Sequence, residues 1–210
     1  MNRRITGVAT IAIAMLAAAG PAAAQTPATE AASFPTANTT RWVVDPVHSQ
    51  VEFGIRHLLG RVRGSFARWY AVIETRDRDW THGAVNVQVR TASINTGNAY
   101  RDTDLRSPRF LSTDSFPEMT FESTNIASRD STVQIWGTLK LKGRSHPVVL
   151  KGRFHGIGKD LEGKERIAFD ASTVVDRRDY GIRWNQLLEG SNTIGDDVEI
   201  TIALEAVRAN

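Results

Sequence analysis

The stretch Val51-Glu52-Phe53-Gly54-Ile55-Arg56-His57 (residues 51–57) alternates apolar and polar side chains. Because side chains two residues apart point to the same face of a strand, Val51, Phe53 and Ile55 are expected to face a hydrophobic interior. His57 shares their phase. We therefore expect its ring to face the interior near the end of the strand. Burial there requires a polar partner for the ring nitrogens, either a protein group or a ligand head group, and metal binding or catalysis is the remaining alternative.

The same period of two recurs along most of the chain. It predicts further half-buried strands in the ranges 42–44, 63–73, 85–89, 119–123, 133–141, 148–154, 167–171 and 198–204. One-sided strands favour an antiparallel sheet, because parallel strands are covered on both faces and read as continuous apolar runs. Roughly eight strands suffice for a closed barrel that holds one small ligand, although a β-sandwich fits the same alternation. The sequence thus predicts an all-β protein.

Residues 98–111 interrupt this rhythm. Tyr100, Leu105 and Phe110 lie there among charged residues, without the alternation of a strand. Their spacing is compatible with one or two short helices broken near Pro108, because proline removes a helical hydrogen bond. We expect a short helical insertion that lies against the sheet as a lid or plug.

The N-terminus has the order of a secretory signal peptide. A basic start at Asn2-Arg3-Arg4 precedes an apolar run over residues 5–19 and small residues at Ala22-Ala23-Ala24. This order predicts export of a soluble protein to the periplasm after removal of residues 1–24.

The rest of the chain is predicted to form a linker and one domain. Residues 25–40 are rich in Ala, Thr and Pro and are expected to be a flexible linker. Residues 41–210 are long enough for one domain with a substantial core, which must be stable without disulfides because the chain has no cysteine. The formal net charge is +3, and loss of Arg3 and Arg4 lowers it to +1. This balance gives no support for nucleic-acid binding.

Catalytic and metal-binding motifs are missing from the sequence. It contains no Gly-x-Ser-x-Gly, His-Glu-x-x-His, cysteine-based zinc, Gly-rich phosphate-loop or EF-hand pattern. The five histidines, at positions 48, 57, 82, 146 and 155, lack the close spacing of metal ligands. We therefore predict a protein that is not an enzyme and that has no metal site and no catalytic cofactor.

Charged residues leave two interpretations open. Arg101 with Asp102, and Arg178 with Asp179, could position a ligand head group or perform acid–base chemistry, but such pairs more often tie a loop or helix end to its neighbour. The range 56–68 contains four arginines and no acidic residue. It is either a docking patch for an anionic membrane surface or simply a solvated face.

A series of short motifs runs in order from Arg41 to Val207. They are Asp45, His48-Ser49, Phe53, His57, Gly64-Ser65-Phe66, Asn98, Arg101-Asp102, Leu105-Arg106-Ser107, Phe110, Phe116-Pro117, Gly137-Thr138-Leu139, Gly143, Arg178-Asp179-Tyr180-Gly181-Ile182 and Gly195-Asp196. No single motif is specific. Their combined order and spacing resemble the YceI-like family of periplasmic polyisoprenoid-binding proteins.

The resemblance implies a fold and a function. The implied fold is an antiparallel, lipocalin-like, eight-stranded barrel, which favours the barrel over the sandwich. The implied function is that of a binding or carrier protein for an isoprenoid quinone or polyprenyl-type chain. An enzyme acting on an isoprenoid lipid or its head group is the alternative, and a metal-binding barrel comes third. The expected partners are the isoprenoid lipid and, transiently, an anionic membrane surface, and a homodimer is compatible with this interpretation.

An isoprenoid chain requires a long apolar cavity, because burial contributes about 0.8 kcal/mol per CH₂. Ten residues, mostly apolar and in strand phase, are candidates for the lining of such a tunnel, although each could instead pack as ordinary core. These candidates are Phe53, Ile55, His57, Phe66, Trp69, Phe110, Phe121, Val133, Ile135 and Leu139.

Overall fold

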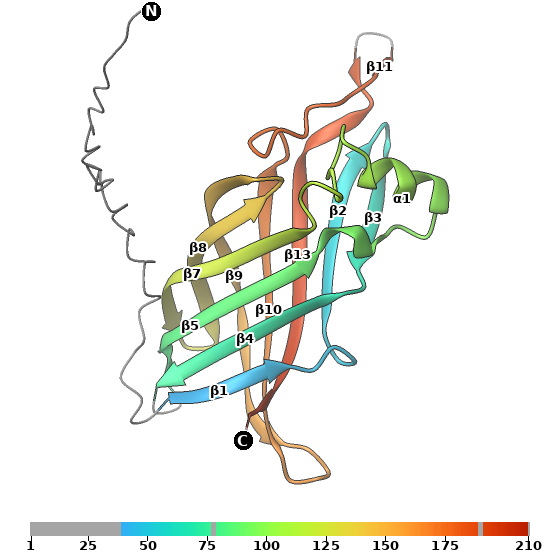
Figure 1. Ribbon diagram of the computed structural model, residues 1–210. Helices are drawn as coiled ribbons and strands as arrows, with labels where there is room; N and C mark the ends of the chain where they lie inside the picture. The colour runs from blue at the N-terminus through green and yellow to red at the C-terminus, as the bar shows by residue number, and fades with distance from the viewer. Residues whose placement is uncertain (1–38, 77–78, 189–190, 210) are drawn as a thin grey trace, which may run out of the picture. The chain divides into compact units, whose positions relative to one another are not determined.

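The computed structural model describes residues 39–76, 79–188 and 191–209, which form an antiparallel barrel with one short α-helix (Figure 1). The elements are β1 (Thr39–Val44), β2 (Gln50–His57), β3 (Gly60–Phe66), β4 (Trp69–Arg76), β5 (Asp79–Arg90), the 3₁₀ turn η1 (Thr91–Ser93), β6 (Ile94–Asn95), α1 (Ala99–Arg106), β7 (Glu118–Arg129), β8 (Thr132–Leu141), β9 (Arg144–Lys159), β10 (Glu165–Asp176), β11 (Leu187–Leu188), β12 (Ser191–Asn192) and β13 (Ile194–Arg208). No helix in these ranges is both long and apolar enough to span a membrane.

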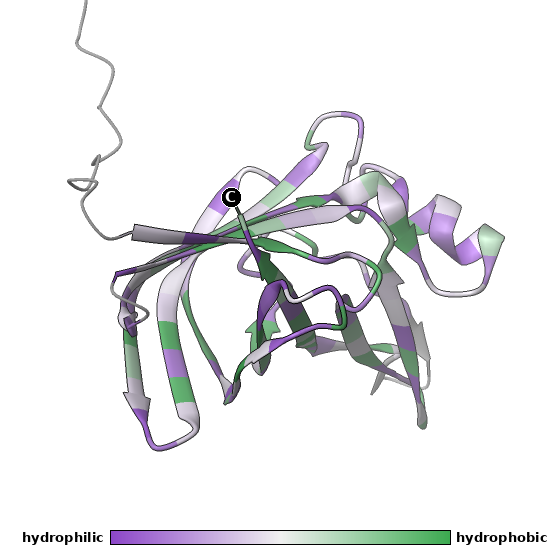
Figure 2. Cartoon of the chain, turned by 90° about the horizontal axis from the view of Figure 1, so that it is seen from below, coloured by the Kyte–Doolittle hydropathy of each residue, from purple (hydrophilic) through white to green (hydrophobic). Residues whose placement is uncertain are grey.

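Eight strands close the barrel. They pair antiparallel in the order β1-β4-β5-β7-β8-β9-β10-β13, and β1 pairs back onto β13, with Trp42 opposite Arg208 and Val44 opposite Ala206. Because the ring is closed, the prediction of an antiparallel eight-stranded barrel is confirmed and the sandwich alternative is wrong. The alternation of hydrophobic and hydrophilic residues along the strands is visible in Figure 2.

One edge of β13 is shared between two partners, and this extends the barrel wall. Residues 206–208 of β13 pair with β1, whereas its range 194–203 pairs with β2. β3 and β6 continue the sheet beyond β2. The three additional strands stand outside the ring and, together with α1, enlarge one end of the barrel (Figure 1).

The predicted strand over residues 63–73 is two strands in the structure. β3 belongs to the extension and β4 to the closed ring, and the chain turns between them at Ala67 and Arg68. Ser93 stabilises this turn, because its carbonyl oxygen accepts from Ala67 N and its Oγ accepts from Arg68 N. The prediction was wrong because no Gly, Pro, Asn or Asp marks the turn.

The short helical insertion is confirmed. The Asn98 side chain caps the N-terminus of α1 by accepting from Arg101 N at 3.0 Å. The helix ends at Arg106 because Ser107, which precedes Pro108, has an extended backbone.

Side chains pack tightly in two regions of the barrel interior. Near the β1–β13 seam, Trp42 is 1% exposed, and its Nε1 donates to Thr75 Oγ1 at 3.1 Å. The rings of Trp80, Phe154 and Phe169 contact one another with centroid distances of 4.9–5.7 Å. Side chains therefore fill the barrel in these two regions, which lie away from α1.

The predicted N-terminal boundaries lie mostly outside the described residues. The signal peptide over residues 1–24 and the linker up to residue 38 stay predictions. Thr39 and Thr40, which were expected to end the linker, are the first residues of β1 and pair with Arg76 and Thr75.

Candidate functional site

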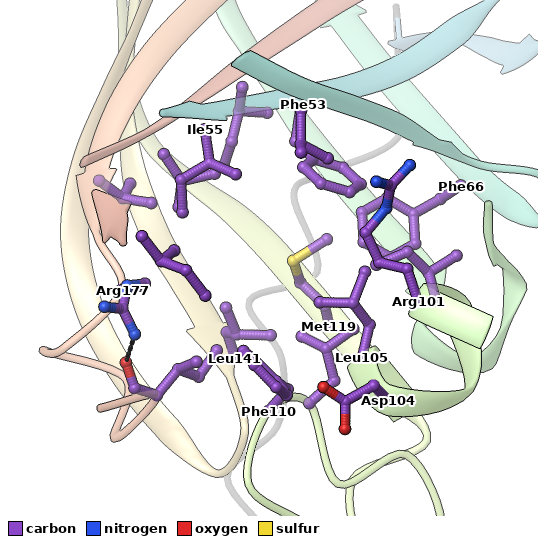
Figure 3. Close-up of a pocket in the computed structure, with 18 of the residues that line it drawn as sticks. Phe53, Ile55, Phe66, Arg101, Asp104, Leu105, Phe110, Met119, Leu141 and Arg177 are labelled. Carbon is purple, nitrogen blue, oxygen red and sulfur yellow. Dashed lines mark hydrogen bonds between the residues drawn. The ribbon is translucent and has the colours of Figure 1, made fainter. Parts of the chain in front are cut away.

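A cavity of about 330 Å³ lies between the β2–β3 extension, α1 and the open end of the ring (Figure 3). Polar residues in its wall are Glu52, His57, Tyr100, Arg101, Asp104 and Arg177. The other lining residues are apolar: Val51, Phe53, Ile55, Val62, Phe66, Ile94, Leu105, Phe110, Leu111, Met119, Leu141, Val175, Ile182, Trp184, Ile194, Val198 and Ile200. The composition of this wall suits an apolar ligand.

A second, smaller cavity of about 50 Å³ adjoins the first. Val51, Met119 and Ile200 line both, and the second cavity continues along β5, β7, β8 and β9. Phe121 lies in its wall and covers Gly137, where a Cβ atom would come within 2.4 Å of Phe121 Cζ. The two cavities together give an apolar path from the mouth beside α1 into the ring.

The inward-facing residues of β8 follow this path along the barrel axis. Val133 and Ile135 belong to the packed core, Leu139 lines the second cavity and Leu141 lines the first. β13 shows the same order in reverse, from Val198 in the first cavity to Leu204 in the core. The interior thus changes from packed to hollow toward α1.

The predicted tunnel residues fall into three groups, and ligand contact stays a prediction for all of them. The first cavity contains Phe53, Ile55, His57, Phe66 and Phe110, and the second contains Phe121 and Leu139. Three candidates line neither cavity and pack in or against the core: Trp69, Val133 and Ile135. For Val133 and Ile135, the period of two gave the correct face of the strand but not its depth along the barrel. Trp69 is three residues from Phe66, and both reach the interior because they lie on separate strands.

His57 has the predicted phase but not the predicted burial. His57 lines the cavity together with Phe53 and Ile55. It is nevertheless exposed to solvent, because β2 ends at His57 and the chain turns there into β3. The expectation of a buried ring was therefore wrong. At the rim of the cavity, water can satisfy the imidazole nitrogens.

Arg101 and Asp102 hold α1 through a shared neighbour, Thr96. Arg101 Nε donates to Thr96 Oγ1 at 2.8 Å, and Asp102 Oδ1 accepts from Thr96 N at 2.9 Å and from Thr96 Oγ1 at 2.6 Å. Asp102 is buried. The structural interpretation of these two charges is confirmed, since they fasten the first turn of α1 beside the cavity.

Arg177, which no sequence motif marked, is the most deeply buried charge in the wall. The residue is 4% exposed, and its guanidinium donates to the carbonyl oxygens of Ile182, Trp184 and Gly195 at 2.8 Å each and to Asp196 Oδ1 at 2.9 Å. One of these hydrogen bonds is drawn in Figure 3. Arg177 thereby holds the segment that brings Ile182 and Trp184 into the cavity wall. That segment has no periodicity from which sequence patterns could place it.

Arg178 stabilises a loop, as the structural interpretation expected, but its partners are Asp176 and Asp196 and not Asp179. Arg178 instead binds Asp176, with Nε 3.0 Å from both carboxylate oxygens, and its Nη1 lies 3.1 Å from Asp196 Oδ2. The Arg178 guanidinium holds the pKa of Asp176 below its usual range. This pair stabilises the turn after β10 and lines neither cavity.

A cluster of potential metal ligands lies elsewhere, at the start of the β1–β2 connection. Ligating atoms of Asp45, His48 and Glu205 lie within 4.8 Å of one another, although their sequence spacing gave no sign of this. Arg166 Nη1 donates to Asp45 Oδ2 and to Glu205 Oε1 at 2.7 Å each. The guanidinium already supplies a positive charge to these carboxylates, and Arg166 also binds Asp160.

Asp45 makes this cluster sensitive to acid. Hydrogen bonds from Arg166 and then His48 hold the pKa of Asp45 well below its ordinary value of 3.8. A lowered folded-state pKa stabilises the protein above the ordinary value, and this contribution is lost as pH falls from about 4 toward the folded pKa. Asp45→Asn should therefore lower the free energy of unfolding by about 1 to 2 kcal/mol at pH 7.

Urea unfolding of wild type and Asp45→Asn across pH checks this expectation. The difference between the two proteins should shrink progressively below about pH 4, because the wild-type carboxylate then takes up a proton as well. A difference that stays constant down to acid pH would contradict the assigned role of the Asp45 carboxylate.

Comparisons with known proteins agree with this architecture. The family model of the YceI-like domain matches residues 42–206. The UPF0312 protein SA2479 of Staphylococcus aureus (strain N315) is 31% identical over 169 residues, which cover 79% of this chain and 96% of that protein. The crystal structure of the Campylobacter jejuni YCEI protein has a TM-score of 0.65 at 29% identity, and the match covers 74% of this chain and 91% of that one.

Two more distant structures show the same fold. Burkholderia cenocepacia BcnA has a TM-score of 0.69 at 19% identity, over 77% of this chain and 98% of its own. A polyisoprenoid binding domain from Saccharophagus degradans, implicated in plant cell wall breakdown, has a TM-score of 0.60 at 16% identity, over 80% of this chain and 98% of its own. With the family model matched over nearly the whole barrel, this chain belongs to the YceI-like family.

Proposed function

We propose that the protein is a periplasmic carrier that holds one isoprenoid chain in its barrel without altering it. The observation that carries this proposal is the apolar path formed by the two adjoining cavities, which meet at Val51, Met119 and Ile200. An isoprenoid tail is a long run of apolar groups, and each buried CH₂ contributes about 0.8 kcal/mol. A long dry path is therefore sufficient for binding.

The polar residues of the wall support a particular orientation of the ligand. The guanidinium group of Arg101 donates to Thr96, and that of Arg177 donates to residues 182, 184, 195 and 196. His57 and Tyr100 are exposed at the mouth. The apolar tail is thus proposed to enter the ring while the head group stays at the mouth near these two residues.

The Saccharophagus degradans domain supports the ligand class only through its fold, because its identity to this chain is 16%. The choice of an isoprenoid as the ligand rests on two observations together: the shared fold and the apolar lining of the two cavities. The engagement of Arg101 and Arg177 in structural hydrogen bonds favours a carrier over an enzyme.

Organic extraction of protein purified from its native envelope, followed by mass spectrometry, tests the proposal. We expect an isoprenoid lipid in an amount comparable to that of the protein, and we expect an added isoprenoid to be recovered unchanged. An extract without lipid, or conversion of the added isoprenoid, would overturn the carrier function.

Export is a separate expectation that rests on the sequence of residues 1–24. The mature protein should begin near Gln25 and appear in the periplasmic fraction. Intact-mass measurement of the purified protein checks this, and a mass that retains residues 1–24 would refute it.

A further inference from the structure

The hairpin between β2 and β3 places two leucines in solvent beside the cavity mouth. His57 pairs with Gly60, so Leu58 and Leu59 form a two-residue turn, in which they are 41% and 105% exposed. His57 and Val62, on the two sides of this turn, line the cavity. The exposed leucines and the mouth are therefore parts of one structural element.

Two leucines are an unfavourable choice for a turn that contacts only solvent. Leu58 has φ = 52°, a left-handed conformation that favours Gly, Asn or Asp in two-residue hairpin turns. A branched apolar residue in this position costs conformational energy and also exposes apolar surface. Such a local conflict at the tip of an element indicates a functional constraint.

The outer face of the same hairpin carries Arg56, Arg61 and Arg63. Arg56 lies directly opposite Arg61 in the register, a relation in which like charges are destabilising when neither is paired. Arg61 pairs with Glu199, and Arg56 Nη1 donates to Leu58 O at 3.1 Å. Arg63 is exposed, and no partner for its guanidinium is found among the described residues. The face thus has cationic groups available for an anionic partner.

We propose that the β2–β3 hairpin docks the protein onto an anionic lipid bilayer. Leu58 and Leu59 enter the boundary between head groups and acyl chains, while Arg56 and Arg63 meet lipid phosphates. A bilayer is the partner favoured by these observations, because two exposed leucines at a hairpin turn, with basic side chains on the adjoining strands, match an apolar layer beneath an anionic surface. Tyr100, 87% exposed at the same mouth, suits the interfacial region.

Docking in this orientation would open the cavity toward the membrane, so that an apolar chain could enter without crossing water. That consequence rests on the proposed carrier function. The docking itself does not depend on the carrier function. Leu58, Leu59, Arg56 and Arg63 are not among the residues that line the cavity, whereas Ile200 is.

Flotation of the full mature protein with vesicles tests the docking. The vesicles contain equal parts of phosphatidylglycerol and phosphatidylcholine, or phosphatidylcholine alone. We expect binding to the anionic vesicles that weakens with salt, and a loss of about tenfold or more for Leu58→Ser combined with Leu59→Ser. Arg63→Gln should weaken binding to the anionic vesicles and leave binding to the neutral ones unchanged.

Leu161→Ser is the matched control. Leu161 is 108% exposed in the β9–β10 turn, at the opposite end of the barrel domain in Figure 1, and its sequence neighbours are Asp160 and Glu162. This variant should float like wild type. Wild type that fails to float, a double variant that floats normally, or an equal loss for Leu161→Ser would overturn the proposal.

Ile200→Trp, which narrows the cavity, separates the two proposals. This variant should still float with anionic vesicles, since its hairpin is intact. A loss of flotation for Ile200→Trp would contradict docking through the tip, whereas unchanged lipid recovery from the same variant would count against the carrier function alone.

Discussion

Replacing Arg177 with methionine is expected to lower the free energy of unfolding by about 3 to 5 kcal/mol, the cost of removing one partner from a buried charged network. Three carbonyl oxygens and Asp196 would lose their donor in a region where the arginine is only 4% exposed. Because the released segment carries Ile182 and Trp184, the cavity wall should loosen as well. Urea unfolding measures the first effect and lipid recovery the second.

Arg178→Met is the matched control for this prediction. Arg178 is the next residue, but its side chain is 54% exposed and binds carboxylates near the surface. Exposed pairs contribute little, so this variant should lose much less stability and retain its lipid. Equal losses for the two variants would contradict the role assigned to Arg177.

Ile200→Trp should reduce the lipid recovered with the protein by at least about tenfold, because each buried CH₂ displaced from the path forfeits about 0.8 kcal/mol. Ile200 lines both cavities, so an indole there occupies the point at which they join. The protein should stay folded, since the added volume enters existing space rather than the packed core.

Val174→Trp is the corresponding control on the outer face. Val174 in β10 is 62% exposed and pairs with Glu199 of β13, one residue before Ile200. Its substitution adds the same side chain without entering the barrel. If Ile200→Trp retained wild-type amounts of lipid while both variants were folded, the path through the two cavities would not hold the chain.

The alternating pattern predicted which face of each strand is buried, because burial of one face is a local property with a period of two. It therefore identified the inward face of β2 and β8. The pattern could not predict depth along the barrel, which depends on register with neighbouring strands. Val133 and Leu139 consequently looked equivalent: both are buried, but only Leu139 lines a cavity.

Long-range pairing accounts for the remaining differences. His57 has the phase of a buried residue, but β2 ends at the barrel mouth, so its side chain meets solvent. Arg177 binds carbonyl oxygens up to 18 residues away, and the Arg166 cluster joins residues that are 121 positions apart. Neither contact has a sequence spacing from which it could be read, because the first forms within an irregular segment and the second forms where the closed barrel pairs β1 with β13.

The position of the chain in the loaded protein tests the central claim most directly. A crystal structure of protein purified with its lipid should contain continuous density from the mouth near Tyr100, past Met119 and Ile200, into the second cavity beside Phe121 and Leu139. Density for the lipid on the outer surface, with both cavities empty, would contradict the account.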